Sequence, residues 1–242
     1  MTSTLRPAAQ EAVAASTTAP RRRTPSFVKR NSLAIVSFTL FLVFAVGMVL
    51  TGHDSYNAEQ IAHGGTAVSF GTYVREGHIW EALFENWESE FLQMGAYVLL
   101  TVFLIQKGSA ESKDPEQHDA VDDDPRDADL RTRVPWPVRR GGPWLFVYEN
   151  SLFLAFVVLF VASLVGHALG GVDAYNADLQ QHHQPLVDTW GYATSAQFWF
   201  ESFQNWQSEF LAVFAIVVLS IFLRQRGSAE SKPVAAPHRA TG

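Results

Sequence analysis

The sequence contains no cysteine, and no recognisable catalytic motif stands anywhere in its 242 residues. Without a thiol the chain cannot form a disulfide, a thiolate metal site or a cysteine nucleophile. It also has no phosphate-binding loop, no nucleophile elbow and no His-Glu-x-x-His zinc motif. These absences favour a protein that is not an enzyme and that carries no cofactor and no metal.

Charged residues are almost absent from four apolar blocks. Residues 33–50 and 152–169 each run about eighteen residues without a formal charge, enough for a helix of roughly 27 Å, and His167 is the only strongly polar residue of the second. The blocks 91–105 and 210–223 are shorter. In a globular protein these four helices would have to be buried. The rest of the sequence contains too little amphipathic helix or alternating strand to cover them. The pattern predicts an all-α membrane protein with four transmembrane helices.

The chain repeats itself at an interval of 119 residues. Residues 27–113 align with 146–232 without a gap, and more than a third of the pairs are identical. Asn-Trp-x-Ser-Glu-Phe-Leu stands at 86–92 and 205–211, and Gly-Ser-Ala-Glu-Ser-Lys at 108–113 and 227–232. Such a match indicates a tandem repeat of a two-helix hairpin. Because the first apolar block recurs in mid-chain, it reads as a membrane anchor rather than a cleaved signal peptide.

Basic residues are nearly missing between the two helices of each hairpin. Arg75 is the only Lys or Arg within 52–90 and 171–209. By the positive-inside rule both of these loops are external and both termini are cytosolic. Each repeat has two spans, so both copies insert in the same orientation and the repeat is parallel.

The predicted organisation has five parts. Residues 1–26 and 233–242 are disordered cytosolic ends, and 114–143 is a cytosolic linker, acidic and then basic. Repeat 1 covers 27–113, with spans at about 33–51 and 87–106. Repeat 2 covers 144–232, with spans at about 152–170 and 206–225. The basic end of the linker is expected to bind anionic lipids at about 1 kcal/mol per arginine, through Arg131, Arg133, Arg139 and Arg140.

The duplicated Asn-Trp-x-Ser-Glu-Phe-Leu and Gly-Ser-Ala-Glu-Ser-Lys blocks resemble those of a bacterial family of small four-helix integral membrane proteins, known only as a domain of unknown function. The resemblance covers about residues 27–232. It implies a multi-pass protein of the bacterial cell (inner) membrane. It brings no activity, cofactor or catalytic residue with it.

The second helix of each repeat carries a first candidate site. A block of fifteen residues spans roughly 22 Å, less than the roughly 30 Å of hydrocarbon, so each helix must begin earlier. That places Glu90 and Glu209 just inside the outer boundary, one turn after an Asn, where a carboxylate is a functional candidate. The paired polar site consists of Asn86, Glu90, Asn205 and Glu209.

The alternative is a pair of glutamates that reach the headgroups within an aromatic belt. The belt consists of the interface aromatics Trp80, Trp87, Trp199 and Trp206. We expect the polar loops to fold back and supply hydrogen-bond donors to Glu90 and Glu209, through Tyr56-Asn57 and Tyr175-Asn176. We expect Glu85 to face water.

The loops carry a second candidate. Asp54 with His63, and Asp173 with His182, are residue types that bind metals. The alternative is that both aspartates cap short helices after a glycine. The candidate loop site consists of Asp54, Tyr56, Asn57, His63, Asp173, Tyr175, Asn176 and His182.

Three functions follow from these features. The first is a non-catalytic structural or interaction protein whose external aromatic and polar caps bind a partner, a lipid or an envelope component. The second is a small transporter or channel that uses Glu90 and Glu209, which the lack of other ionisable groups in the helices disfavours. The third is a metal-dependent membrane enzyme built on the Asp and His pairs.

Overall fold

The structure is a computed structural model that describes residues 26–114 and 116–242, and these residues contain helices and turns but no strand. The chain divides into two compact units, 1–59 and 60–242. Most of the predicted disordered N-terminus, including Arg21, Arg22 and Arg23, lies outside the described residues.

The first unit contains α2 (Phe27–Arg30) and most of α3 (Ser32–Ala62). The helix α3 continues well past residue 51, where the span was expected to end. No proline or glycine follows Gly52 within it, and Ala, Glu and Gln favour helix. Within its apolar part, the hydroxyls of Thr39 and Thr51 donate to the carbonyls four residues earlier, at 2.8 Å in both cases. Polar side chains are thereby satisfied inside an apolar helix.

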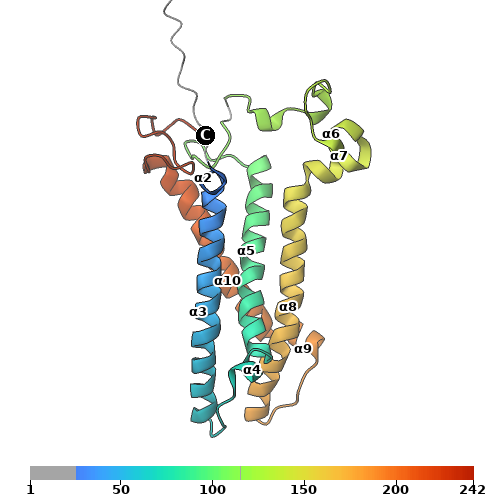
Figure 1. Cartoon of the computed structure of the whole chain (residues 1–242), viewed down its shortest axis with the longest axis vertical. Helices are drawn as coiled ribbons and strands as arrows, with labels where there is room; N and C mark the ends of the chain where they lie inside the picture. Colours follow the sequence, from blue (N-terminus) through green and yellow to red (C-terminus); the bar gives the residue numbers. More distant parts are fainter. Residues whose placement is uncertain (1–25, 115) are drawn as a thin grey trace, which may run out of the picture. The chain divides into compact units, whose positions relative to one another are not determined.

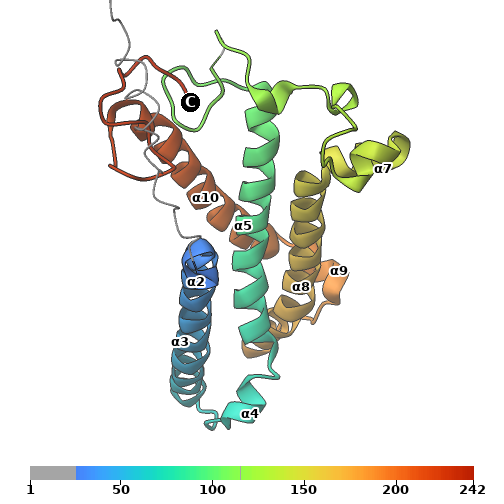
Figure 2. The ribbon, with the colours of Figure 1, turned by 45° about the horizontal axis from the view of Figure 1, so that its top comes forward.

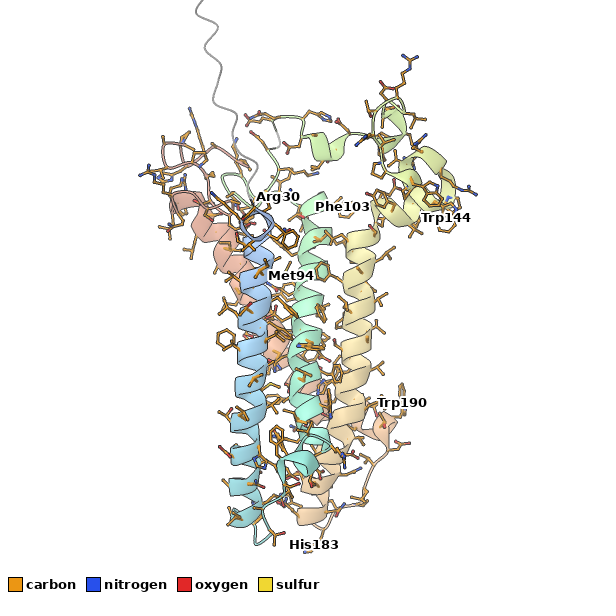
Figure 3. The ribbon with its side chains drawn as sticks, in the orientation of Figure 1. Arg30, Met94, Phe103, Trp144, His183 and Trp190 are labelled. Carbon is orange, nitrogen blue, oxygen red and sulfur yellow. The ribbon has the colours of Figure 1, made fainter. Side chains whose placement is uncertain are left out.

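The second unit is built on three long helices: α5 (Gly77–Phe103), α8 (Ser151–Gln181) and α10 (Ala196–Phe222). In Figures 1 and 2, α5 lies along α8 and α10 crosses behind α5. Two short helices, α4 (Phe70–Tyr73) and α9 (Thr189–Ala193), lie at one end of these three. The linker lies at the opposite end, as the positions of Trp144 and Trp190 show in Figure 3.

The helices that align in sequence have equal lengths. The helices α3 and α8 each have 31 residues, and α5 and α10 each have 27. After α8 the chain turns at His183 (φ 53°), and after α3 at Gly64 (φ 80°). In both turns the next amide donates to the carbonyl five residues earlier at 2.8 Å, which caps the helix. The polar segments after Gly52 and Gly171, predicted as loops, are therefore helical at first.

Two glycines of α8 allow close contact with α5. A Cβ atom added at Gly166 would lie 2.6 Å from the ring of Phe84, and one at Gly170 would lie 2.8 Å from the backbone nitrogen of Glu81. Small residues four apart let helices approach closely in membranes. Gly166 and Gly170 therefore let α8 pack closely on α5.

Both Gly-Ser-Ala-Glu-Ser-Lys motifs form the same turn after a long helix. The Ser112 hydroxyl accepts from the amide of Gln106 at 2.9 Å, and the Ser231 hydroxyl accepts from the amide of Gln225 at 2.9 Å. Gly108 (φ 88°) and Gly227 (φ 84°) are left-handed within these turns and lie beyond the ends of α5, at Phe103, and of α10, at Phe222. The motif thus forms a turn beyond the end of the helix and satisfies an exposed amide there.

The two lysines of the motif have different surroundings. Lys113 pairs with Asp122 at 2.7 Å. Lys232 is buried, and its ammonium donates to the backbone carbonyls of Gly108, His238 and Ala240. The amide of Gly242 also donates to the Ser109 carbonyl at 3.1 Å. The C-terminal tail, which was predicted to be disordered, therefore packs on the first motif, because a buried ammonium requires acceptors that this tail supplies.

The linker forms the short elements η1 (Ala120–Asp122), η2 (Pro125–Asp127), α6 (Trp136–Arg140) and α7 (Gly142–Glu149). Arg140 lies 5.8 Å from the ring centre of Trp136, and that ring contacts Trp144 with the two centres 5.4 Å apart. A guanidinium over an indole is a favourable cation–π contact. The basic end of the linker thus presents arginines beside exposed tryptophans.

Among the described residues, three helices are long and apolar enough to cross a membrane: α3, α8 and α10. The helix α5 is as long as α10 but carries four glutamates in its first half, Glu81, Glu85, Glu88 and Glu90. These glutamates distinguish α5 from the other three long helices.

Candidate functional site: a buried histidine–carboxylate cluster

His167 is the only strongly polar residue of the apolar part of α8, and it is fully buried. Its Nδ1 lies 3.1 Å from Oε2 of Glu88 on α5, and both side chains have 0% exposure. The imidazole stacks on the ring of Phe198 with centres 4.5 Å apart. An ionisable side chain in such surroundings needs a partner, and Glu88 is that partner.

Glu88 connects three helices. While one carboxylate oxygen faces His167 on α8, the other accepts from the Ser202 hydroxyl at 2.7 Å and from the Trp206 indole N–H at 3.2 Å, both on α10. Several donors on one buried carboxylate fix its orientation. The side chains around Glu88 therefore hold α5, α8 and α10 together at one point.

The other ring nitrogen of His167 faces a second group of polar atoms. Nε2 lies 3.5 Å from Oε2 of Glu201 and 3.3 Å from the hydroxyl of Tyr192. That hydroxyl donates to Glu201 at 2.6 Å and lies 3.1 Å from Oε1 of Glu81. Burial raises the pKa of Tyr192, so the phenol stays protonated. Its single proton cannot serve all three neighbours at once.

The sequence around α9 positions Tyr192. The Asp188 carboxylate caps α9 by accepting from the amide of Gly191 at 2.7 Å. Before it, the Asn176 side chain donates to the Val187 carbonyl at 2.8 Å and accepts from the Val187 amide at 2.9 Å. A Cβ atom at Gly171 would lie 2.5 Å from the Tyr192 hydroxyl. Glu81, Glu85, Glu88, His167 and Glu201 are hereafter called the cluster. The Tyr192 phenol reaches the cluster only because residue 171 is glycine.

Further polar groups surround this centre. Asn205 donates to Glu85 at 2.5 Å, Gln197 donates to Glu201 at 2.6 Å, and His78 lies 3.9 Å from Glu81. A cavity of about 310 Å³ lies beside the cluster. It is lined by Glu81, Ala174, Tyr175, Asp178, Gln197 and Glu201. The cavity gives the carboxylates of Glu81 and Glu201 a route to small ligands.

The cluster has an excess of acidic groups. The carboxylates of Glu88 and Glu201 lie 3.1 and 3.5 Å from one fully buried imidazole. A third, from Glu81, has an oxygen within 4.8 Å of it, and the carboxylate of Glu85 is near enough to act on it electrostatically. Within residues 26–114 and 116–242, the ion pairs of these carboxylates are all with histidines. Even a protonated His167 leaves net negative charge in a poorly hydrated place. Protons or a bound cation are needed to balance it.

The four residues of the predicted paired polar site do not come together as one group. Asn86 donates to the Ala82 carbonyl of its own helix at 2.7 Å, and Glu90 is exposed. Glu209 is partly buried and lies close enough to Glu90 for electrostatic repulsion. Only Asn205 contacts the cluster, through Glu85. Glu85, which was expected to face water, is partly buried there.

The aromatic residues predicted to form a belt line the same helix ends. Trp80 donates its indole N–H to the Val74 carbonyl at 3.0 Å, and Trp87 contacts the ring of Phe84 edge-on. Trp199 and Trp206 contact each other with ring centres 6.2 Å apart. The indole N–H of Trp206 also donates to Glu88, so Trp206 takes part in the hydrogen bonds of the cluster as well as in the aromatic belt.

The residues of the candidate loop site do not form one group in the structure. In the second repeat, Asp173 and His182 are exposed, and His182 lies 3.6 Å from Asp178. Tyr175 packs on Tyr192, while Asn176 binds Val187. The expectation that these two residues supply donors to Glu209 is wrong, because α8 continues through them and turns them towards α9.

In the first repeat, Asp54 is exposed on α3, 3.7 Å from His53, and the Asn57 amide lies 3.0 Å from that same imidazole. Tyr56 is partly buried on α3, and His63 is exposed just after this helix. The group of described residues with metal-ligand geometry is instead Glu81, His167 and Glu201.

The histidine and the four glutamates of the cluster stand where the two repeats differ, whereas Tyr192 aligns with Tyr73. His167 aligns with Met48, Glu201 with Ala82, and the acidic residues of α5 with Phe200, Gln204 and Gln207. A second signal is periodic: Glu81, Glu85 and Glu88 are spaced by four and three residues and share one face of α5. Neither signal lies at positions that are identical in the two aligned repeats.

Comparison with known proteins gives a family but no activity. No curated protein and no solved structure matches the chain. Residues 24–242 match the family described as Domain of unknown function (DUF6766). This match includes every residue of the cluster, all four long helices and the tail. The chain belongs to the DUF6766 family.

Proposed function

We propose that the protein is a four-span protein of the bacterial cell membrane, built from a parallel duplication, with both termini in the cytosol. The equal lengths of α5 and α10 and of α3 and α8 support the duplication and the proposal that α5 is the fourth span. The position of α4 and α9 at one end of the second unit, opposite the linker, supports the topology. On this topology the cluster lies at the outer end of the bundle.

Its proposed function is to bind a cation in this cluster without catalysing a reaction. The observation that carries the proposal is a group of four carboxylates near one buried imidazole, of which three have an oxygen within 4.8 Å of it. Among the described residues none of these carboxylates is paired with a lysine or an arginine. Intramembrane carboxylates of this kind mark functional sites and require compensation. A bound cation would balance the charge and stabilise the contacts that orient α9.

The remainder of the bundle favours a binding site over a transport pathway. Residues 91–103 of α5, 151–166 of α8 and 210–222 of α10 contain no Asp, Glu, Lys, Arg or His. An ion or proton leaving the cluster towards the cytosol would meet no further acidic, basic or histidine side chain in these segments. Transport normally requires such groups along the path.

The proposal predicts that cations stabilise the protein through the cluster. The melting temperature of the full chain in detergent should rise when choline chloride is replaced, at equal ionic strength, by at least one of Na⁺, K⁺, Mg²⁺, Ca²⁺ or Zn²⁺. The rise should shrink in Glu201→Gln, which removes one carboxylate of the cluster, and persist in Glu90→Gln. If no cation raises the melting temperature above its value in choline, the protein has no cation site.

The topology has its own test. Reporter fusions at Thr66 and Pro185 should report the external side, because the segments around them carry almost no basic residue. Fusions at Asp123 and Thr241 should report the cytosolic side. An external Asp123 would overturn the four-span arrangement.

The outer end also offers a contact surface for a partner. Trp190 on α9 is 76% exposed, whereas Tyr192 two residues later is fully buried in the cluster. A large exposed aromatic side chain held by a fixed neighbour is typical of an interaction site. The contact of Arg140 with Trp136, beside Trp144, supports the proposal that the basic end of the linker binds anionic lipid headgroups.

A further inference from the structure

We infer that the cluster is a divalent transition-metal site in which Glu81, His167 and Glu201 are the ligands and Glu88 orients the imidazole. The inference rests on the proposed cation-binding function and names the ion class and the residues that bind it. None of the residues predicted from sequence as metal ligands takes part.

The three ligands come from three helices, α5, α8 and α10. One ligand atom from each of Glu81, His167 and Glu201 lies within 4.8 Å of the other two. Metal–ligand bonds of about 2.0–2.2 Å place two ligands of one ion at most about 4.4 Å apart. Binding one ion requires these atoms to move by a few tenths of an ångström. It also requires the Tyr192 hydroxyl, which lies 2.6–3.3 Å from all three ligands, to move aside.

The orientation of His167 supports a metal. When Nδ1 carries the proton and donates it to Glu88 at 3.1 Å, Nε2 presents its lone pair to the carboxylate of Glu201 at 3.5 Å. A lone pair facing a carboxylate is repulsive unless a proton or a metal ion lies between them. The Tyr192 hydroxyl cannot remove the repulsion, because its proton lies on the short 2.6 Å contact to Glu201.

The surroundings of Glu88 match those of a residue that supports a metal ligand. A histidine that binds a metal through one nitrogen almost always donates its other N–H to a carboxylate or carbonyl. Glu88 accepts from His167 in this way, and the donors Ser202 and Trp206 fix its other oxygen. Glu88 is therefore a positioning residue.

Access and the donor set indicate the kind of ion. The 310 Å³ cavity opens on Glu81 and Glu201 and leaves room for water as further ligands. One imidazole and two carboxylates, without any sulfur ligand, suit Zn²⁺, Mn²⁺, Fe²⁺ or Co²⁺ rather than Cu⁺. The aligned positions of the ligands in the other repeat hold Phe200, Met48 and Ala82. The chain should therefore bind one ion and not two.

The test uses the full chain, purified in detergent without a histidine tag, stripped with a chelator and reloaded with Co²⁺ or Zn²⁺. Elemental analysis should find one metal per chain, and Co²⁺ should give visible absorption bands typical of nitrogen and oxygen ligands. Glu81→Gln and Glu201→Gln should each abolish stoichiometric binding. Glu88→Gln should weaken binding about 10–100-fold, as loss of a supporting carboxylate does.

The matched control is Asp178→Asn, which removes a carboxylate from the same cavity without touching the three ligands. It should retain one metal per chain. Glu81 is partly exposed, with 14% of its side chain accessible, so Glu81→Gln should fold even if variants of His167 do not. Normal elution in gel filtration verifies folding for each variant.

The outcomes separate this inference from the proposed function. Retention of one metal per chain by Glu81→Gln and Glu201→Gln would overturn the ligand assignment. Stabilisation by Na⁺, K⁺, Mg²⁺ or Ca²⁺ without stoichiometric Co²⁺ or Zn²⁺ binding would overturn the transition-metal site and leave the cation-binding function standing. No response to any cation would overturn both.

Discussion

Glu88→Ala is expected to lower the free energy of unfolding by about 3–5 kcal/mol, the range found when one partner of a buried ion pair is removed. Glu88 has 0% exposure, and its two oxygens accept from His167, Ser202 and Trp206. Truncation to alanine leaves these three donors buried without an acceptor. It also leaves a cavity where α5, α8 and α10 meet.

The measurement is reversible unfolding of the metal-free protein in mixed micelles, with an increasing mole fraction of a denaturing detergent. Glu90→Ala is the matched control: it lies two residues along the same helix, is exposed, and should change stability by less than about 0.5 kcal/mol. Equal losses for the two variants would mean that the buried hydrogen bonds of Glu88 do not hold the helices together.

The helical fold was largely predictable, because apolar runs and a gapless repeat are strong signals in a sequence. The ends of the helices were less so. The first helix of each repeat was expected to stop near Gly52 and Gly171, yet each continues for about three turns beyond its glycine. The residues that follow, such as Ala58 and Leu179, tolerate helix well, and a single glycine costs only about 1 kcal/mol. The turns at Gly64 and His183 end the helices instead.

The cluster was only partly predictable, since its members come from three helices and no local motif unites them. His167 alone was conspicuous as a polar residue in an apolar run. Its partner could not be chosen from the sequence, because the direction in which α5 turns its glutamates depends on how α5 packs on α8. Gly166 and Gly170 set that packing by admitting Phe84 and the backbone of Glu81. Only then does the face with Glu81, Glu85 and Glu88 point at His167.

Glu90 and Glu209 were predicted as a site because they are identical in the two aligned repeats, but the cluster does not include them. Duplication initially gives two equal copies, and residues that keep both copies folded stay equal. A single asymmetric site requires different residues in each copy. Here one repeat supplies the acidic face of α5, and the other supplies His167, Tyr192 and Glu201. In this cluster the differences between the repeats carry more functional information than the identities.

Gly170→Ala is expected to destabilise the protein by about 1–3 kcal/mol, the usual cost of an overpacked contact. The added Cβ atom would lie 2.8 Å from the backbone nitrogen of Glu81 and 3.1 Å from the carbonyl carbon of Trp80. Neither backbone atom can move away without shifting α5 relative to α8. Such a shift also displaces Glu81 and Glu88 from His167, so metal affinity should fall together with stability.

The control for this prediction is Gly71→Ala on α4, where an added Cβ atom meets nothing within 4 Å. Replacing a helical glycine by alanine is otherwise stabilising by about 0.5–1 kcal/mol, since alanine loses less backbone entropy on folding. The two substitutions are chemically the same, but their surroundings differ. In the same unfolding titration the free energy of unfolding should rise slightly for Gly71→Ala and fall for Gly170→Ala. An increase in stability for both variants would show that there is room for a methyl group between α5 and α8. The close contact that directs the acidic face of α5 towards His167 would then not exist.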